Sequence, residues 1–135
     1  KKIKTLSPHF IFYFSSPKIY IGKSSNRKLS NFYNLIFVDY VKIILNILKK
    51  NKINARIFYP STVFLNNQEK FKRFSCYMNS KKKAENLCNI KIYKNFVRLF
   101  RLPRISTRSN YNILGFYEGK KIEVLDKFID KFLKN

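Results

Sequence analysis

Residues 71–101 read FKRFSCYMNSKKKAENLCNIKIYKNFVRLFR. The fold predicted for the whole chain depends on the secondary structure assigned to this stretch. The first part alternates by twos, with Phe74, Cys76 and Met78 on one side, which is typical of a strand with one side facing solvent or a partner. The last part is also strand-like, since Ile90 and Ile92 bracket a lysine. Three lysines lie between the two parts. We therefore predict a long β-hairpin over about 71–101 with a basic tip.

Upstream, the sequence predicts a strand, a helix and a second strand. Residues 18–23 alternate apolar and polar positions, as a half-buried strand does. A helix should run from about Ser30, a candidate cap, to Lys50, because apolar residues recur there every three or four positions. A short strand over 55–58 should then end before Pro60. The apolar positions expected to face the core from this helix are Tyr33, Phe37, Val41, Ile44 and Leu48.

Downstream, a short helix should begin at Ser106 or Thr107 and reach Leu114, and residues 121–125 alternate like a last strand. The chain then ends in a pattern typical of an amphipathic helix. We thus predict an α+β, ferredoxin-like sandwich: a mainly antiparallel four-stranded sheet with two helices on one face, plus the long protruding hairpin and terminal extensions. The expected division is an N-terminal extension over 1–17, a domain over 18–125 and a C-terminal amphipathic helical extension over 126–135.

The charge of the chain points to a polyanionic partner. Its 135 residues include 29 lysines and arginines against 7 acids, a formal net charge of +22 that would repel itself in a compact monomer. Nucleic acid is the leading candidate. A membrane surface is the runner-up, and we expect no membrane partner because the charge is spread over every segment and the apolar run 37–48 is too short to span. With 45% hydrophobic and 17% aromatic residues, the chain should fold.

Catalysis finds no support in the sequence. The seven acids are scattered with no pair placed as acid and base, and His9 has no evident nucleophile partner. With one histidine and only Cys76 and Cys88, a zinc site lacks ligands. A disulfide across the hairpin is possible, although reduced thiols are favoured. We expect no enzyme, cofactor, metal or small-molecule substrate.

Basic and aromatic residues of the hairpin are the candidate RNA contacts. The lysines at the tip could release counterions from a nucleic-acid groove, or form a solvated loop, and those on the arms could follow the phosphate backbone. Two arginines at the start of the second helix would add to the positive end of its dipole. The two tyrosines could stack on unpaired bases or pack within the hairpin. The candidates are Arg73, Tyr77, Lys81, Lys82, Lys83, Lys91, Tyr93, Lys94, Arg98, Arg101, Arg104 and Arg108.

Six collinear segments resemble the bacterial-type small-subunit ribosomal protein S ten family. Residues 54–60, NARIFYP, resemble its GAKISGP, and 41–50, VKIILNILKK, resemble VKKIVEVAKR. Residues 71–88 align without a gap with FTVLRSPHVNKKSREQFE. Residues 91–97, KIYKNFV, resemble RTHKRLI. Pro103 and Thr107 fall near DPTPKT, and residues 119–124, GKKIEV, resemble GVDVEI. The LPT turn and the SPH of the family are replaced, by residues 65–67 and 76–78.

This resemblance covers about 18–125 and implies a structural constituent of the head of the small ribosomal subunit. In that family the hairpin threads between rRNA and neighbouring proteins of the S three, S nine and S fourteen families. The resemblance also implies an alternative, a free RNA-binding protein or transcription antitermination partner. The drift is similar to that of organellar members, and the residue usage suits an AT-rich genome. We therefore expect the mitochondrial matrix and its ribosome, with a plastid as the alternative.

Overall fold

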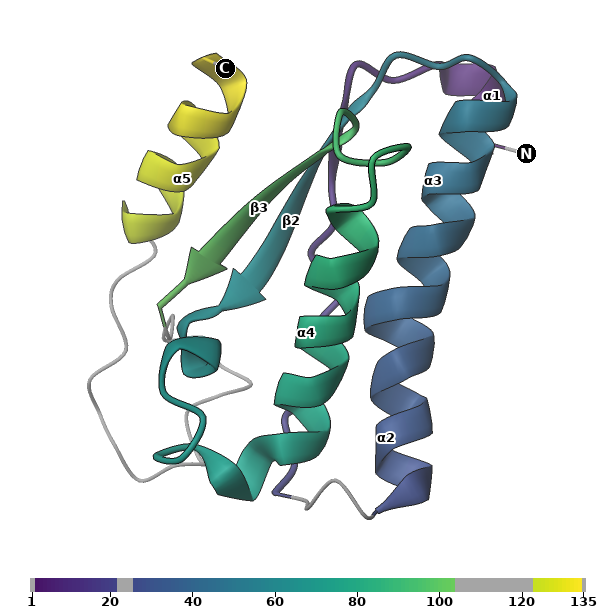
Figure 1. Ribbon diagram of the computed structural model, residues 1–135. Coiled ribbons are helices and arrows are strands. Elements are labelled where there is room, and N and C mark those ends of the chain that lie inside the picture. The colour runs from purple at the N-terminus through teal and green to yellow at the C-terminus, as the bar shows by residue number, and fades with distance from the viewer. Residues whose placement is uncertain (1, 22–25, 104–122, 135) are drawn as a thin grey trace.

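The computed structural model describes residues 2–21, 26–103 and 123–134. Three parallel strands form one open sheet in the order β1-β2-β3. Figure 1 labels two of them, β2 and β3. Helices alternate with the strands along the chain, so β1, β2 and β3 are joined by two successive βαβ crossovers. The strands are β1 (Phe10–Phe12), β2 (Arg56–Thr62) and β3 (Val97–Leu102), and the helices are α1 (Lys2–Leu6), α2 (Arg27–Asn34), α3 (Tyr40–Lys50), α4 (Ser75–Cys88) and α5 (Glu123–Lys134).

The predicted ferredoxin-like sandwich is therefore wrong. Among the described residues there is no antiparallel four-stranded sheet, because the sheet has three strands and all run the same way. Residues 18–21 lie outside it, and its first strand is β1. The helix predicted from Ser106 or Thr107 lies outside the described residues, as do positions 121 and 122 of the expected last strand. Positions 123–125 belong to α5.

The sheet is covered on both faces. Figure 1 shows α3 and α4 on one side of it and α5 on the other. Alternation along β2 separates these two layers: Ile57 and Tyr59 belong to the main core under the helices, whereas Phe58 packs with Phe132 of α5. Both cores are rich in aromatic rings, and the ring centroids of Phe58 and Phe132 are 5.5 Å apart in an edge-to-face arrangement.

The long predicted helix is present, running from Arg27 to Lys50 through a π-helical turn, η1 (Leu35–Asp39), between α2 and α3. A π turn weakens the regular ladder, and two carbonyls of η1 accept hydrogen bonds from tyrosines of the sheet layer. Tyr59 donates to Phe37 at 3.2 Å, and the hydroxyl of Tyr13 donates to Ile36. Asn26, and not the predicted Ser30, caps the start of the helix by accepting from the backbone of residue 29.

By length and composition alone, the helix Arg27–Lys50 could cross a membrane. Core helices of globular proteins meet the same criteria, and this one has a fully buried face. Five of its side chains are 0% exposed: Tyr33, Phe37, Val41, Leu45 and Leu48.

The stretch that was predicted to be a hairpin is mostly helical. A short 3-10 turn, η3 (Lys72–Phe74), leads into α4, and turns over 89–96 then lead to β3. The alternation by twos was misleading because α4 buries polar side chains among its apolar ones. Ser80, Lys81 and Glu85 are all buried on this helix. The apolar residues alone therefore do not show the helical period.

Pro60 lies within β2, although the sequence predicted that the strand would end before it. Along β2 the N–H groups alternate in direction, since that of Arg56 donates to His9 beside β1 and that of Ile57 donates to Phe96 beside β3. The missing N–H of Pro60 therefore falls on the β1 side. Because β1 pairs only as far as Phe58, the proline removes no ladder hydrogen bond there.

Candidate nucleic-acid interface

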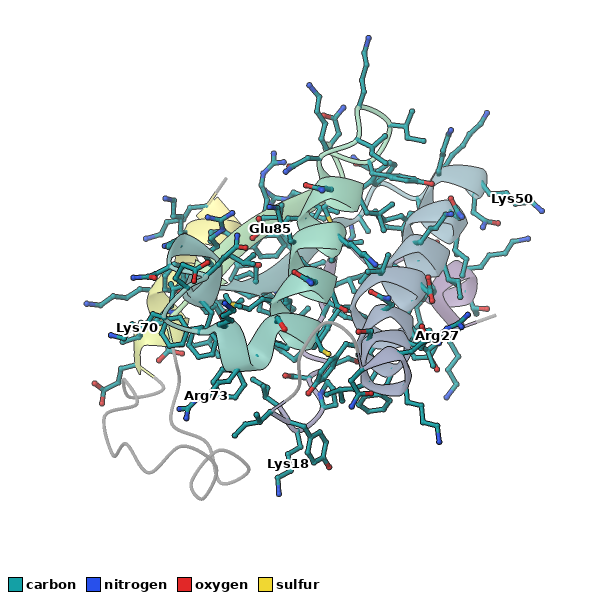
Figure 2. The ribbon with its side chains drawn as sticks, turned by 60° about the horizontal axis from the view of Figure 1, so that its bottom comes forward. Lys18, Arg27, Lys50, Lys70, Arg73 and Glu85 are labelled. Carbon is teal, nitrogen blue, oxygen red and sulfur yellow. The ribbon has the colours of Figure 1, made fainter. Side chains whose placement is uncertain are left out.

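Basic side chains gather where the strands end and where α2 and α4 begin. Figure 2 shows this end of the molecule, with Lys18, Lys70 and Arg73 along it, Arg27 at the start of α2, and Lys50 at the far end of α3. Glu69 is an acid in the same turns. We call this surface the basic end, and it comprises the exposed residues Lys18, Arg27, Lys28, Lys70, Lys72 and Arg73.

Helix dipoles add to the charge of the basic end. In βαβ units the helices run opposite to the parallel strands, so α2 and α4 both point their N-termini toward the carboxyl edge of the sheet (Figure 1). Neither helix has an acidic residue in its first turn. The carboxyl edge is also where open parallel sheets commonly bind ligands. The combined field favours an anion.

A groove runs between α2 and α4 behind the basic end. Its volume is about 430 Å³, and no acidic residue in the described part of the chain lines it. Two side-chain bonds join the helices across it: Ser80 donates to Asn34 at 2.9 Å, and Ser30 donates to the sulfur of Cys76 at 3.4 Å. We call it the α2–α4 groove. Its lining residues are Arg27, Ser30, Asn31, Asn34, Cys76, Asn79, Ser80, Lys82, Lys83 and Asn86.

The predicted RNA contacts are not brought together on a finger. Lys82 and Lys83 line the α2–α4 groove, and Arg73 lies at the basic end. Lys91 and Lys94 are exposed in the turns before β3, apart from that end. The guanidinium of Arg98 is 3.5 Å from the carbonyl oxygens of residues 94 and 97. Arg104 and Arg108 lie outside the described residues.

Lys81, which was placed at the hairpin tip, is buried in the core with 4% of its surface exposed. Its ammonium donates to the carbonyl of Pro60 at 2.7 Å and lies 4.0 Å from the ring centroid of Phe37 and 4.8 Å from that of Tyr59. Loss of water around the ammonium lowers the pKa of Lys81 to about 7, opposed by the nearby Glu85. Because β1 has ended at this level, Lys81 supplies the hydrogen bond that the Pro60 carbonyl would otherwise lack.

The two candidate stacking tyrosines are also buried. Tyr77 packs edge-to-face against Phe37 at 5.5 Å, and burial raises the pKa of Tyr77 to about 12. The hydroxyl of Tyr93 donates to Asn46 of α3 at 2.6 Å. The sequence left base stacking and packing within the hairpin open for both tyrosines. The structure shows both rings packed in the core, Tyr77 on α4 and Tyr93 in the turns before β3.

Arg101 is bound to Glu85 by two hydrogen bonds. Its Nε and Nη2 atoms donate to the carboxylate at 2.9 and 2.7 Å, and Ser61 donates to the same group at 2.6 Å. Burial alone would raise the pKa of Glu85, but the bonds from Arg101 and Ser61 and the charges of Arg101 and Lys81 lower it overall. Arg101 is thus held by an acid of α4, although its side chain remains 46% exposed.

Sequence reasoning missed the amide side chains of the groove and the cations of the basic end outside the hairpin. Arg27, Asn31 and Asn34 recur on α2 at three- and four-residue spacings, as Asn79, Lys83 and Asn86 do on α4. This polar helical period was the available signal on α2. On α4 the same polar period is visible only once the segment is known to be helical.

Comparison with protein-family models, with curated proteins and with solved structures finds no match. Across residues 2–21, 26–103 and 123–134, no three His, Cys, Asp or Glu side chains gather as metal ligands would. Cys76 and Cys88 are both buried on α4 and are not joined by a disulfide. Burial raises the pKa of the Cys88 thiol to about 12.

Proposed function

We propose that the chain is a structural RNA-binding protein of a small ribosomal subunit, with rRNA as its counter-charge. The observation that carries the proposal is the basic end, where six exposed cations and the N-termini of two helices lie together. Such a surface favours the closely spaced charges of a phosphate backbone over isolated anions. The net charge of +22 over 135 residues supports the same partner.

The ribosomal part of the proposal rests on the resemblance to the S ten family. The long hairpin that would thread into rRNA in that family is not formed over 71–101. RNA contact is therefore proposed for the basic end and the α2–α4 groove, and Lys81, Tyr77 and Tyr93 are no longer proposed as contacts. Placement in the subunit head, beside proteins of the S three, S nine and S fourteen families, and location in the mitochondrial matrix belong to the same proposal.

Salt-dependent RNA binding by the purified full chain tests the surface. Each phosphate contact on single-stranded RNA contributes about 0.7 to the slope of log affinity against log salt concentration. Replacing Lys70, Lys72 and Arg73 together with alanine should lower that slope by about 2 and weaken binding. The matched control removes three exposed cations of the long helix, Lys42, Lys49 and Lys50. Equal losses from both triple variants would contradict an interface at the basic end.

Sedimentation tests the assembly. The tagged chain should travel with the small subunit through a high-salt gradient, and crosslinking should recover one region of rRNA. Recovery of many unrelated transcripts from a chain that is free of ribosomes would instead support the alternative of a free RNA-binding protein.

A further inference from the structure

We propose that the α2–α4 groove holds a short run of unpaired RNA nucleotides and contacts their base edges through its amide side chains. This inference rests on the proposed RNA-binding function. It adds the place at which the protein contacts RNA bases and the unpaired form of the RNA that binds there. It starts from the composition of the lining. Four of the lining side chains are amides, namely Asn31, Asn34, Asn79 and Asn86, and three are cations, namely Arg27, Lys82 and Lys83.

The amides distinguish this groove from a plain phosphate site. A phosphate offers only acceptors, so cations and N–H groups satisfy it. An asparagine presents a donor and an acceptor side by side, which matches the edge of a base, adenine above all. Asn31, Asn79 and Asn86 are exposed in the groove, while Asn34 uses its oxygen to accept from Ser80. The NH₂ group of Asn34 is not used in that bond.

The two helices place these groups in two rows, one on each helix. Bonds join residue 30 to residue 76 and residue 34 to residue 80, so α2 and α4 run side by side in the same direction, with Asn79 level with residue 33. The row on α4 therefore begins where the row on α2 ends, and the two rows follow one another along the groove. From Arg27 to Asn34, and from Asn79 to Asn86, each row spans roughly 10 Å at the helical rise of about 1.5 Å per residue. A stacked strand rises about 3.4 Å per nucleotide, so each row matches about three nucleotides.

The concave shape favours unpaired RNA over a duplex. A-form duplexes present a shallow minor groove and outward phosphates, and side chains cannot read their deep major groove. A groove of about 430 Å³ between two helices instead receives a base that projects from a loop or bulge. Among the residues that the structure describes, no aromatic ring lines the groove, so its selectivity comes from hydrogen bonds and not from stacking.

Fluorescence anisotropy with the full-length chain tests the inference. The probes are single-stranded oligoadenylate and oligouridylate of twelve nucleotides and an RNA duplex of the same length, each at two salt concentrations. We expect the oligoadenylate to bind most tightly. The double variant Asn79→Ala/Asn86→Ala should lower its affinity at least about fivefold, the low end for a base-specific amide contact, and leave the salt slope unchanged. Lys82→Ala/Lys83→Ala should instead lower the slope, by about 1.4 for two phosphates.

Matched controls lie outside the groove. Asn54→Ala/Asn95→Ala removes two exposed amides, and Lys49→Ala/Lys50→Ala removes two exposed cations; neither should reproduce the effect of its groove counterpart. Undiminished oligoadenylate affinity in both groove variants, or equal binding of the duplex, would overturn the inference while RNA binding at the basic end survives. Absence of RNA binding by the wild-type chain would overturn the proposed function as well.

Discussion

Replacing Lys81 with methionine should remove a pH dependence of stability that belongs to this one side chain. The folded chain lowers the pKa of Lys81 from 10.5 to about 7, so between these values the unfolded chain binds more protons than the folded one. The free energy of unfolding therefore rises with pH in that range. This gain in the free energy of unfolding is complete above the pKa of Lys81 in the unfolded chain, and it is lost as the pH falls through the pKa of Lys81 in the folded chain.

The size of the effect follows from the same shift. For a folded pKa near 7, the wild-type free energy of unfolding should rise by about 1–2 kcal/mol between pH 7 and 8.5 through Lys81 alone, since one pKa unit is worth about 1.4 kcal/mol. The rings of Phe37 and Tyr59 and the Pro60 carbonyl stabilise the ammonium, so this value is an upper bound. The window ends at pH 8.5 because the thiol of Cys88, whose pKa is raised, has the opposite slope at higher pH.

Urea unfolding followed by circular dichroism measures this difference at fixed ionic strength. Lys81→Met keeps the volume of the side chain and should show no rise from this group. Lys82→Met removes the same charge from the exposed neighbouring position and should retain the full rise. If the two methionine variants behave alike, Lys81 is solvated, as it would be at the tip of a hairpin, and the reasoning from burial fails.

Three further perturbations test the contacts between layers. Glu85→Gln should lower the free energy of unfolding by about 2–3 kcal/mol at pH 7, because Arg101 and Ser61 lose a charged partner. In the wild type this contribution disappears as the pH falls below about 4.5, the ordinary pKa from which that of Glu85 is lowered. The control Glu69→Gln, at an exposed position, should leave the free energy of unfolding nearly unchanged. Phe132→Ala should lower the free energy of unfolding by about 3–5 kcal/mol, since the ring is 0% exposed against β2 and β3. The control Leu133→Ala, at an exposed position, should not lower it by this amount. Equal effects of the two changes would show that α5 does not pack as described. Tyr93→Phe should cost about 1 kcal/mol in a thermal or urea melt through loss of the bond to Asn46, and an unchanged stability would place that hydroxyl in water.

The long helix was predictable because its signal is local. Tyr33, Phe37, Val41 and Leu48 recur at helical spacing, and tertiary packing only confirmed which side they bury. The helical pattern from Leu125 to Leu133 likewise corresponds to α5. The basic character of the chain is also a property of composition alone, as is the expectation of a polyanionic partner, which stays a prediction.

The identity of residues 75–88 depended instead on distant parts of the chain. Lys81 and Glu85 are stable on the inner face of α4 only because β2 supplies the Pro60 carbonyl and Ser61, and β3 supplies Arg101. Without those partners, a buried lysine and a buried glutamate would each cost several kcal/mol, so apolar periodicity assigned both side chains to solvent and the segment to part of a β-hairpin. The direction of the sheet follows from this helix, because a crossover helix between β2 and β3 allows parallel pairing, whereas a hairpin enforces antiparallel pairing.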